Sequence, residues 1–150
     1  MAKVDVRTEI EIQAPIEKVA TYASNPVNAP TWYVNINKAE WVEGNTVSVG
    51  SKISFQAAFL GKVLNYTYEI VEYIPNESMI MRTAQGPFPM ETTYTFEKIN
   101  NETTLMKLRN AGKPSGFSAL FAPFMKGAMR RANNKDLAMI KEILESMESN

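Results

Sequence analysis

The residues best suited to chemistry lie near the C-terminal end of the chain. Asn133 and Asp136 interrupt the apolar stripe of a helix that the sequence predicts over residues 123–147. At about 100° per residue, Asp136 falls about 20° around the helix axis from Met125, in the middle of that stripe. A buried carboxyl must be paired, hydrogen-bonded or protonated. Asp136 is therefore either an acid or base with a raised pKa, or, more commonly for such a group, a structural residue bonded to a sheet side chain or to the backbone of the short helices.

The other catalytic options are narrow. The chain has neither histidine nor cysteine, which excludes imidazole acid–base steps, Ser-His-Asp triads, thiolate nucleophiles and metal sites built on these residues within it. Any catalysis would have to use Asp, Glu, Tyr, Lys, Ser or Thr. The candidates are Asp136, Asn133 and a tyrosine such as Tyr94, and no clear dyad is evident among them. Arg82 and Glu69 are candidate partners for Asp136. We expect no metal and no cofactor.

The helix that carries these polar residues is apolar on most sides at its beginning. Ala122 precedes Pro123, which predicts a break or kink at this point. The opposite face of the helix carries a basic cluster of Lys126, Arg130, Arg131 and Lys135. We expect this cluster to be solvated rather than bound to acidic lipid. The predicted inward face carries the following apolar residues: Phe121, Met125, Met129, Ala132, Met139, Ile140, Ile143 and Met147.

The segments before the helix predict a sheet. Residues 3–13 alternate between apolar and charged side chains, as expected of a half-buried strand. Pro15 opens a short helix, and Pro26 and Pro30 bracket a second helical turn. Six further strands follow, joined by turns too short for crossover helices, so the sheet is predicted to be antiparallel with about seven strands. Because such a sheet is wider than one helix, it must curl around the helix and leave an interior space.

The residues around this space are predicted to form a cavity of a few hundred cubic ångströms. Ala57, Ala128 and Ala132 contribute little volume where a filled core would need bulk. The alternatives are an ordinary methionine-rich core, with Trp32 as a packing residue, or a ligand site in which Phe88 belongs to a lid. The candidate lining residues are Trp32, Tyr33, Phe55, Phe59, Phe88, Met90, Tyr94, Phe121, Met125 and Met129.

The order of these elements resembles the α+β helix-grip fold of the START-related superfamily called SRPBCC. The segments "IQAPIEKVATYASNPVNAPTW", "YTYEIVEYIPNESMIMRT", "GPFPMETTYTF" and "MRRANNKDLAMIKEILE" look like its polyketide cyclase/dehydrase branch. The resemblance covers nearly the whole chain, as one domain over residues 1–150. It implies a deep apolar cavity between the sheet and the long helix, with Trp32 near the cavity mouth. Relatives bind lipids, polyketides or other hydrophobic molecules, and cyclising members place polar groups inside the cavity.

Three hypotheses follow. The first is a carrier or sensor that binds a small hydrophobic molecule, ring-bearing or acyl, with polar groups near Asn133 or Tyr94. The second is a cyclase or dehydratase that uses Asp136, Asn133 and Tyr94. The third is a protein-interaction module. The missing histidine and the lack of a dyad favour the first over the second.

The partners and location follow from composition. Sixteen basic residues balance sixteen acidic ones, so we expect no nucleic-acid partner. No signal peptide and no apolar run of about 18 residues is evident, so we expect a cytoplasmic protein without stable membrane insertion. A homodimer stays open.

Overall fold

A computed structural model describes residues 4–59, 61–85, 89–112 and 122–149. The elements in chain order are β1 (Val4–Ile12), α1 (Ile16–Ser24), the 3-10 turn η1 (Pro26–Asn28), α2 (Ala29–Trp32), β2 (Ile36–Glu43), β3 (Lys52–Phe59), β4 (Lys62–Ile74), β5 (Ser78–Gln85), β6 (Met90–Asn100), β7 (Thr103–Gly112) and α3 (Ala122–Ser149). The predicted order of one strand, two short helices, six strands and a long helix is confirmed.

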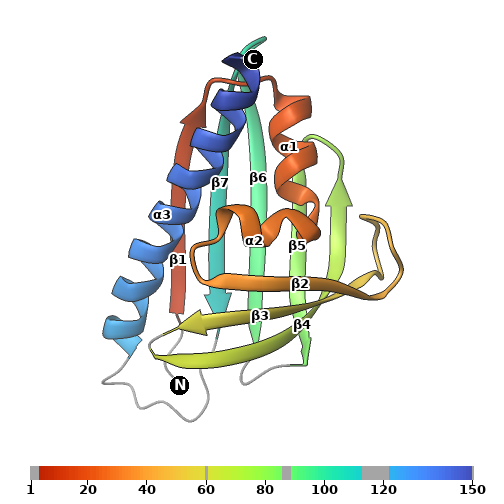
Figure 1. The fold of residues 1–150 in the computed structure, drawn as a ribbon, viewed down its shortest axis with the longest axis vertical. Coiled ribbons are helices and arrows are strands. Elements are labelled where there is room, and N and C mark those ends of the chain that lie inside the picture. Colours follow the sequence, from red (N-terminus) through yellow and green to blue (C-terminus); the bar gives the residue numbers. More distant parts are fainter. Residues whose placement is uncertain (1–3, 60, 86–88, 113–121, 150) are drawn as a thin grey trace.

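The seven strands form one antiparallel sheet in the order β1-β7-β6-β5-β4-β3-β2. In Figure 1, β1, β7, β6 and β5 run along the length of the molecule, whereas β2 and β3 run at a large angle to them, across the lower half of the view. The long strand β4 has register shifts between Thr67 and Tyr68 and between Ile70 and Glu72. Bulges of this kind increase the local twist of a strand. The sheet therefore curls around α3 and the short helices instead of remaining flat.

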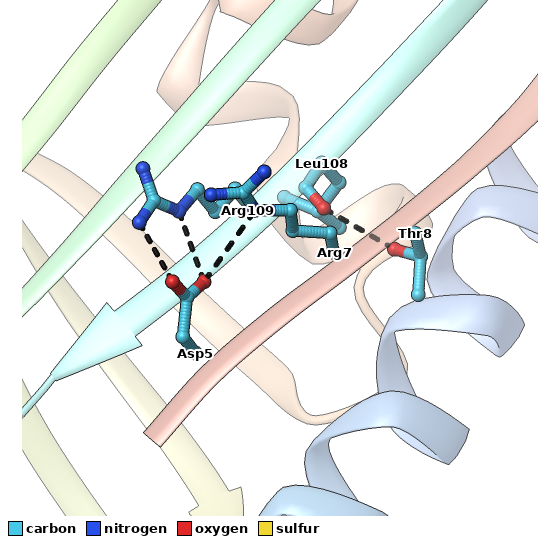
Figure 2. Close-up of polar contacts among 5 residues, drawn as sticks. All are labelled: Asp5, Arg7, Thr8, Leu108 and Arg109. Atoms are coloured by element: carbon cyan, nitrogen blue, oxygen red, sulfur yellow. Dashed lines mark hydrogen bonds and ion pairs between the residues drawn. The ribbon is translucent and has the colours of Figure 1, made fainter. Parts of the chain in front are cut away.

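The outer face of β1 is charged, as its alternating sequence predicts. Arg7 lies directly opposite Arg109 of β7, an arrangement of like charges that would be unfavourable alone. Asp5 accepts two hydrogen bonds from Arg109, at 2.9 and 2.7 Å, and lies 3.9 Å from the Arg7 guanidinium. Thr8 points to the other face and donates to the Leu108 carbonyl at 3.4 Å, as Figure 2 shows. One carboxylate thus offsets two opposed arginines on the solvent side of the sheet.

The interior contains two groups of buried apolar residues. The larger group joins α1, α2 and the C-terminal half of α3 to the sheet, around residues such as Val19, Ile70 and Ile140. The smaller group lies at the other end of α3 and consists of Val4, Val6, Met90, Met125 and Met129. Tyr66 and Tyr68 pack against this second group. The candidate site lies beside it.

The inward face of α3 differs in part from the predicted one. Met139 is 38% exposed and Met147 is 52% exposed, so their placement in the core was wrong. Leu137 and Leu144 are buried instead. The buried stripe is shifted by roughly 55° toward Leu137 relative to the predicted stripe, and Met147 lies near the end of the helix. Pro123 is the second residue of α3, a position where its missing N–H leaves no helical hydrogen bond unmade.

Candidate functional site

A cavity of about 150 Å³ lies between α3 and the inner face of the sheet. The site is smaller than the few hundred cubic ångströms predicted from the sequence. Its walls come from α3, from the segment after α2, and from strands β2 to β7. It exists because α3 presents Ala132 and the two polar residues Asn133 and Asp136 to a curved surface, where longer apolar side chains would fill the space.

Eight of the predicted site residues meet in this cavity: Tyr33, Phe55, Met90, Tyr94, Met125, Met129, Asn133 and Asp136. Trp32 is 1% exposed and is not part of the lining. It packs behind the wall, with its ring centroid 4.2 Å from that of Tyr33 and 5.8 Å from that of Tyr94. Phe88 and Phe121 lie outside the described residues, as does the side chain of Phe59.

The lining also includes residues that the sequence analysis did not propose as site residues. They are Asn35, Ile36, Leu64, Tyr66, Tyr68, Met81, Thr92 and Asn110, besides Ala57 and Ala132, which were predicted to lie around the space. The two tyrosines were missed because tyrosines occur at both parities of β4. The register shift between Ile70 and Glu72 explains this pattern. Tyr66, Tyr68 and Ile70 face inward before the shift, and Tyr73 packs against the core after it.

Two tyrosines form a hydroxyl pair at the cavity wall. The Tyr33 and Tyr94 hydroxyl oxygens are 2.6 Å apart. Burial raises the pKa of both phenols, and the nearby Asp136 carboxyl raises the pKa of each further. Both tyrosines therefore stay neutral at physiological pH. A mutual hydrogen bond uses one of the two hydroxyl protons, so the pair retains a second proton that it can donate.

Asp136 is buried at the same wall, with only 2% of its surface exposed. Its Oδ1 accepts a hydrogen bond of 2.8 Å from the backbone N–H of Val34, directly after α2. Burial raises the pKa of this carboxyl to about 7, an effect that the Val34 hydrogen bond partly opposes. The carboxyl is thus half ionised near neutral pH.

The partners proposed for Asp136 from the sequence were wrong. Arg82 instead forms a hydrogen bond of 2.9 Å with Glu91 on the exposed side of the sheet. Glu69 lies opposite Arg82 in the β4–β5 register. Met81 is buried, and because neighbouring residues of a strand point to opposite faces, Arg82 faces away from the cavity. The other predicted partner was the backbone of the short helices. The hydrogen bond comes from a backbone N–H, but from Val34, just after the end of α2.

A chain of side-chain hydrogen bonds crosses from the sheet to α3. Thr92 Oγ1 donates to Asn110 Oδ1 at 2.7 Å, and Asn110 Nδ2 donates to Asn133 Oδ1 at 3.1 Å. Thr92 and Asn110 are directly opposite in the β6–β7 register. The chain ends at Asn133 Nδ2, which is buried and has no hydrogen-bond partner among the described residues.

A second, more polar hollow of about 340 Å³ adjoins the cavity. Asn35 and Ala132 belong to both linings. Arg131 and Lys135 also line the hollow, and neither forms an ion pair within the described part of the chain. The cavity is therefore apolar in the interior, with a few hydrogen-bonding groups on its wall and positive charge beside it.

The described residues define the chemistry that the site can perform. In ranges 4–59, 61–85, 89–112 and 122–149, no group of acidic residues is placed to hold a metal ion. No helix in the same ranges is both long and apolar enough to cross a bilayer. The cavity offers apolar contact, neutral hydrogen-bond donors and one carboxyl that titrates near pH 7.

Comparison with known proteins agrees with this architecture. Residues 3–145 match the sequence profile of the family described as "Polyketide cyclase / dehydrase and lipid transport". No curated protein sequence matches the chain.

Solved structures with the same fold come from several sources. The Zhui aromatase/cyclase from Streptomyces sp. R1128 has a TM-score of 0.81 at 13% identity, with 96% of this chain and 94% of that chain covered. The protein TTHA0849 from Thermus thermophilus has a TM-score of 0.82 at 20% identity, with coverages of 95% and 98%. A START superfamily protein from Mycobacterium smegmatis has a TM-score of 0.82 at 13% identity, again with coverages of 95% and 98%. At these identities the likeness concerns the fold.

Proposed function

Because the chain belongs to the polyketide cyclase/dehydrase and lipid transport family, we propose that it binds a small hydrophobic molecule in the cavity between sheet and α3, as a carrier or sensor. The family as a whole is associated with hydrophobic ligands, through lipid transport or polyketide cyclisation. The observation that carries the proposal is the cavity itself, about 150 Å³ lined mainly by apolar and aromatic side chains. Concave apolar sites with a few polar groups are typical of small-molecule binding.

The contacts of the polar residues support binding over catalysis. The Asp136 carboxyl accepts a backbone hydrogen bond at 2.8 Å, a contact that supports a structural role. The phenols of Tyr33 and Tyr94 are bonded to each other and held neutral by burial. Neither is therefore prepared to act as a nucleophile. Histidine, the side chain most often used as a general base, and cysteine, an intrinsically strong nucleophile, are both absent from the chain.

The direct test is native mass spectrometry of the protein purified from its own host under non-denaturing conditions. We expect a mass increment that disappears on denaturation, from a ligand that is largely apolar. Ala132→Phe is the matched variant, because Ala132 lines the cavity and a phenyl ring would occupy it. It should bring no ligand through purification. An increment that is equally present in Ala132→Phe would place the ligand elsewhere and contradict the proposal.

A cyclase or dehydratase is the second candidate. It is favoured by one observation, the presence of a carboxyl with a pKa of about 7 in the same cavity as Tyr94 and Asn133. Such a pKa suits general acid–base catalysis at neutral pH. The test is incubation with a short poly-β-keto thioester and detection of a cyclised or dehydrated product. Turnover by the wild type that is abolished in Asp136→Asn would support the enzyme; the same slow conversion with both proteins would support a binding protein.

The cytoplasmic location and the homodimer stay predictions. A protein-interaction module would require a docking surface on the outer face of the sheet. The large exposed apolar side chains among the described residues belong to many separate elements, including Val42 in β2, Ile74 in β4, Ile99 in β6 and Phe124 in α3. This distribution does not favour the third hypothesis.

A further inference from the structure

Asn133 carries a hydrogen-bond donor that is buried in the cavity wall without an acceptor. The residue is 4% exposed, it lines the cavity, and its Nδ2 has no partner among the described residues. A buried amide N–H without an acceptor has lost its hydrogen bonds to water without replacement, which destabilises the folded protein. Such a group in a ligand cavity is satisfied when a bound molecule brings the missing acceptor.

We propose that Asn133 determines the specificity of the cavity, by donating a hydrogen bond from Nδ2 to a carbonyl oxygen of the bound molecule. This inference rests on the proposed function and names the chemical class of the ligand. The cavity then selects a compact apolar ketone, quinone or related carbonyl compound over the corresponding hydrocarbon. A hydrocarbon of the same shape fills the same space but leaves Nδ2 unpaired.

The orientation of the Asn133 amide is fixed from the sheet. Its Oδ1 accepts from Asn110 Nδ2 at 3.1 Å, and Asn110 Oδ1 in turn accepts from the Thr92 hydroxyl at 2.7 Å. Because the Asn133 oxygen is occupied, the nitrogen is the atom left for a ligand. Thr92 and Asn110 are opposite each other on β6 and β7, so the first two residues of this hydrogen-bond chain are held by the backbone of two paired strands.

The other unpaired buried donor lies outside the cavity lining. Trp32 Nε1 likewise has no partner among the described residues, but Trp32 packs behind Tyr33. A ligand in the cavity therefore meets the Asn133 donor and not the indole. The Tyr33–Tyr94 pair also keeps one hydroxyl proton to donate. The unpaired Asn133 N–H and the spare hydroxyl proton of the tyrosine pair both favour an oxygen acceptor on the ligand over a further donor.

The volume of the site limits the size of a suitable probe. An engineered apolar cavity of about 150 Å³ takes up benzene, and this site, at about 150 Å³, suits one or two small fused rings. The matched probes are 1-indanone and indane, which share a bicyclic skeleton and differ in one carbonyl group. Their affinities are measured by titration of 15N-labelled protein, which follows the side-chain amide of Asn133 as well as the backbone.

In the wild type, the Asn133 side-chain amide protons should shift downfield with 1-indanone and not with indane. The carbonyl stretch of bound 1-indanone should move to lower wavenumber, as expected for a hydrogen-bonded ketone. Asn133→Leu should weaken 1-indanone binding about tenfold and reduce the infrared shift, while indane binding changes by less than about twofold. Met129→Leu is the control on the same helix, and it should change both affinities alike.

Three results would contradict the inference or its premise. Equal effects of Asn133→Leu on both probes would assign Asn133 a structural role only. If Asn133→Leu does not fold, Asn133→Ala takes its place, and an unshifted carbonyl stretch in the wild type overturns the inference without any variant. Failure of both probes to bind the wild type would overturn the proposed function itself. Equal binding of 1-indanone and indane would overturn only the inference about Asn133.

Discussion

The carboxylate of Asp136 holds the backbone N–H of Val34 at 2.8 Å, across a separation of 102 residues. Val34 stands between Tyr33 and Asn35, both of which line the cavity. The bond therefore fixes the segment after α2 against α3 and sets one wall of the site. Asp136, which the sequence indicated as a candidate acid or base, therefore also positions one wall of the cavity.

The pH dependence of stability should carry the signature of Asp136. Its pKa is raised from 3.8 to about 7 in the folded protein, so between these values the folded state keeps a proton that the unfolded state releases. The free energy of unfolding contributed by this group should therefore fall as pH rises from about 4 to 7, by about 4 kcal/mol in total, and stay constant above. Urea unfolding of the wild type and of Asp136→Asn at several pH values measures this change in the free energy of unfolding.

The difference between these two proteins is the relevant quantity, because it cancels the titration of the remaining carboxyls. Glu145, whose pKa is lowered by Lys141 and Gln13, contributes equally to both. The free energy of unfolding of Asp136→Asn should decrease less than that of the wild type between about pH 4 and pH 7. Parallel pH profiles would mean that the Asp136 carboxyl is not desolvated in the folded protein.

Removing the Asp136 side chain should reduce stability. Asp136→Ala leaves the Val34 N–H buried without an acceptor, which costs about 1–3 kcal/mol near pH 5, where the carboxyl is mainly protonated. Asp136→Asn keeps an acceptor oxygen and serves as the matched control, with a smaller loss at the same pH. Thermal or urea unfolding at pH 5 compares the two. An alanine variant as stable as the wild type would argue for a functional rather than a structural carboxyl.

Filling the cavity from the helix side should weaken ligand binding. Met125 and Ala132 both line it, and Met125→Trp and Ala132→Phe should each reduce the affinity for an environment-sensitive apolar dye at least tenfold, about 1.4 kcal/mol. The cost in stability should stay below the roughly 1–3 kcal/mol typical of an overpacked core. Fluorescence titration and thermal unfolding measure the two effects.

Met139→Trp is the control for these changes. Met139 lies on the same helix but is 38% exposed, so the same large side chain there should leave dye binding unchanged. Unchanged binding in both cavity variants, or unfolding of both, would show that this end of α3 packs against a solid core.

Two glycines should respond to alanine in opposite ways. A Cβ at Gly127, inside α3, meets only an Arg131 guanidinium nitrogen at 3.6 Å, so Gly127→Ala should raise stability by about 0.5–1 kcal/mol through helix propensity. A Cβ at Gly112, at the end of β7, lies 2.6 Å from the Pro89 carbonyl and also overlaps Met90. Gly112→Ala should therefore lower stability by about 1–3 kcal/mol. Urea unfolding of both variants at one pH checks the signs.

The architecture was predictable because local patterns and topology agree. Residues of β1 and most residues of β6 and β7 alternate between the two faces. Buried residues such as Val6, Tyr94 and Met106 lie where this alternation predicts them. Turns too short for crossover helices determine an antiparallel sheet. The position of Asp136 on the buried side of α3 also followed from helical geometry alone.

The details that escaped prediction depend on three-dimensional context. A register shift in β4 exchanges the face on which residues lie, and no residue type marks its place between Ile70 and Glu72. The roughly 55° shift of the buried stripe of α3, which exposes Met139, depends on how the sheet curves beneath the helix. The donor to Asp136 is a backbone N–H, which every residue but proline possesses, so side-chain identity could not reveal Val34. Asn110, the middle residue of the hydrogen-bond chain from Thr92 to Asn133, lies on a half-buried strand. From the sequence alone it cannot be distinguished from a solvent-facing asparagine.

The pairing of β1 with β7 has a consequence for how the chain reaches its folded state. Val4 lies opposite Gly112 and Ile12 opposite Thr104, so β1 leaves the ribosome about 90 residues before the strand that it pairs with. Contacts so distant along the chain slow folding. During synthesis β1 is an unpaired edge with an apolar face, and the alternating charges Asp5, Arg7, Glu9 and Glu11 on its other face are the kind of side chain that discourages pairing with a neighbouring nascent chain.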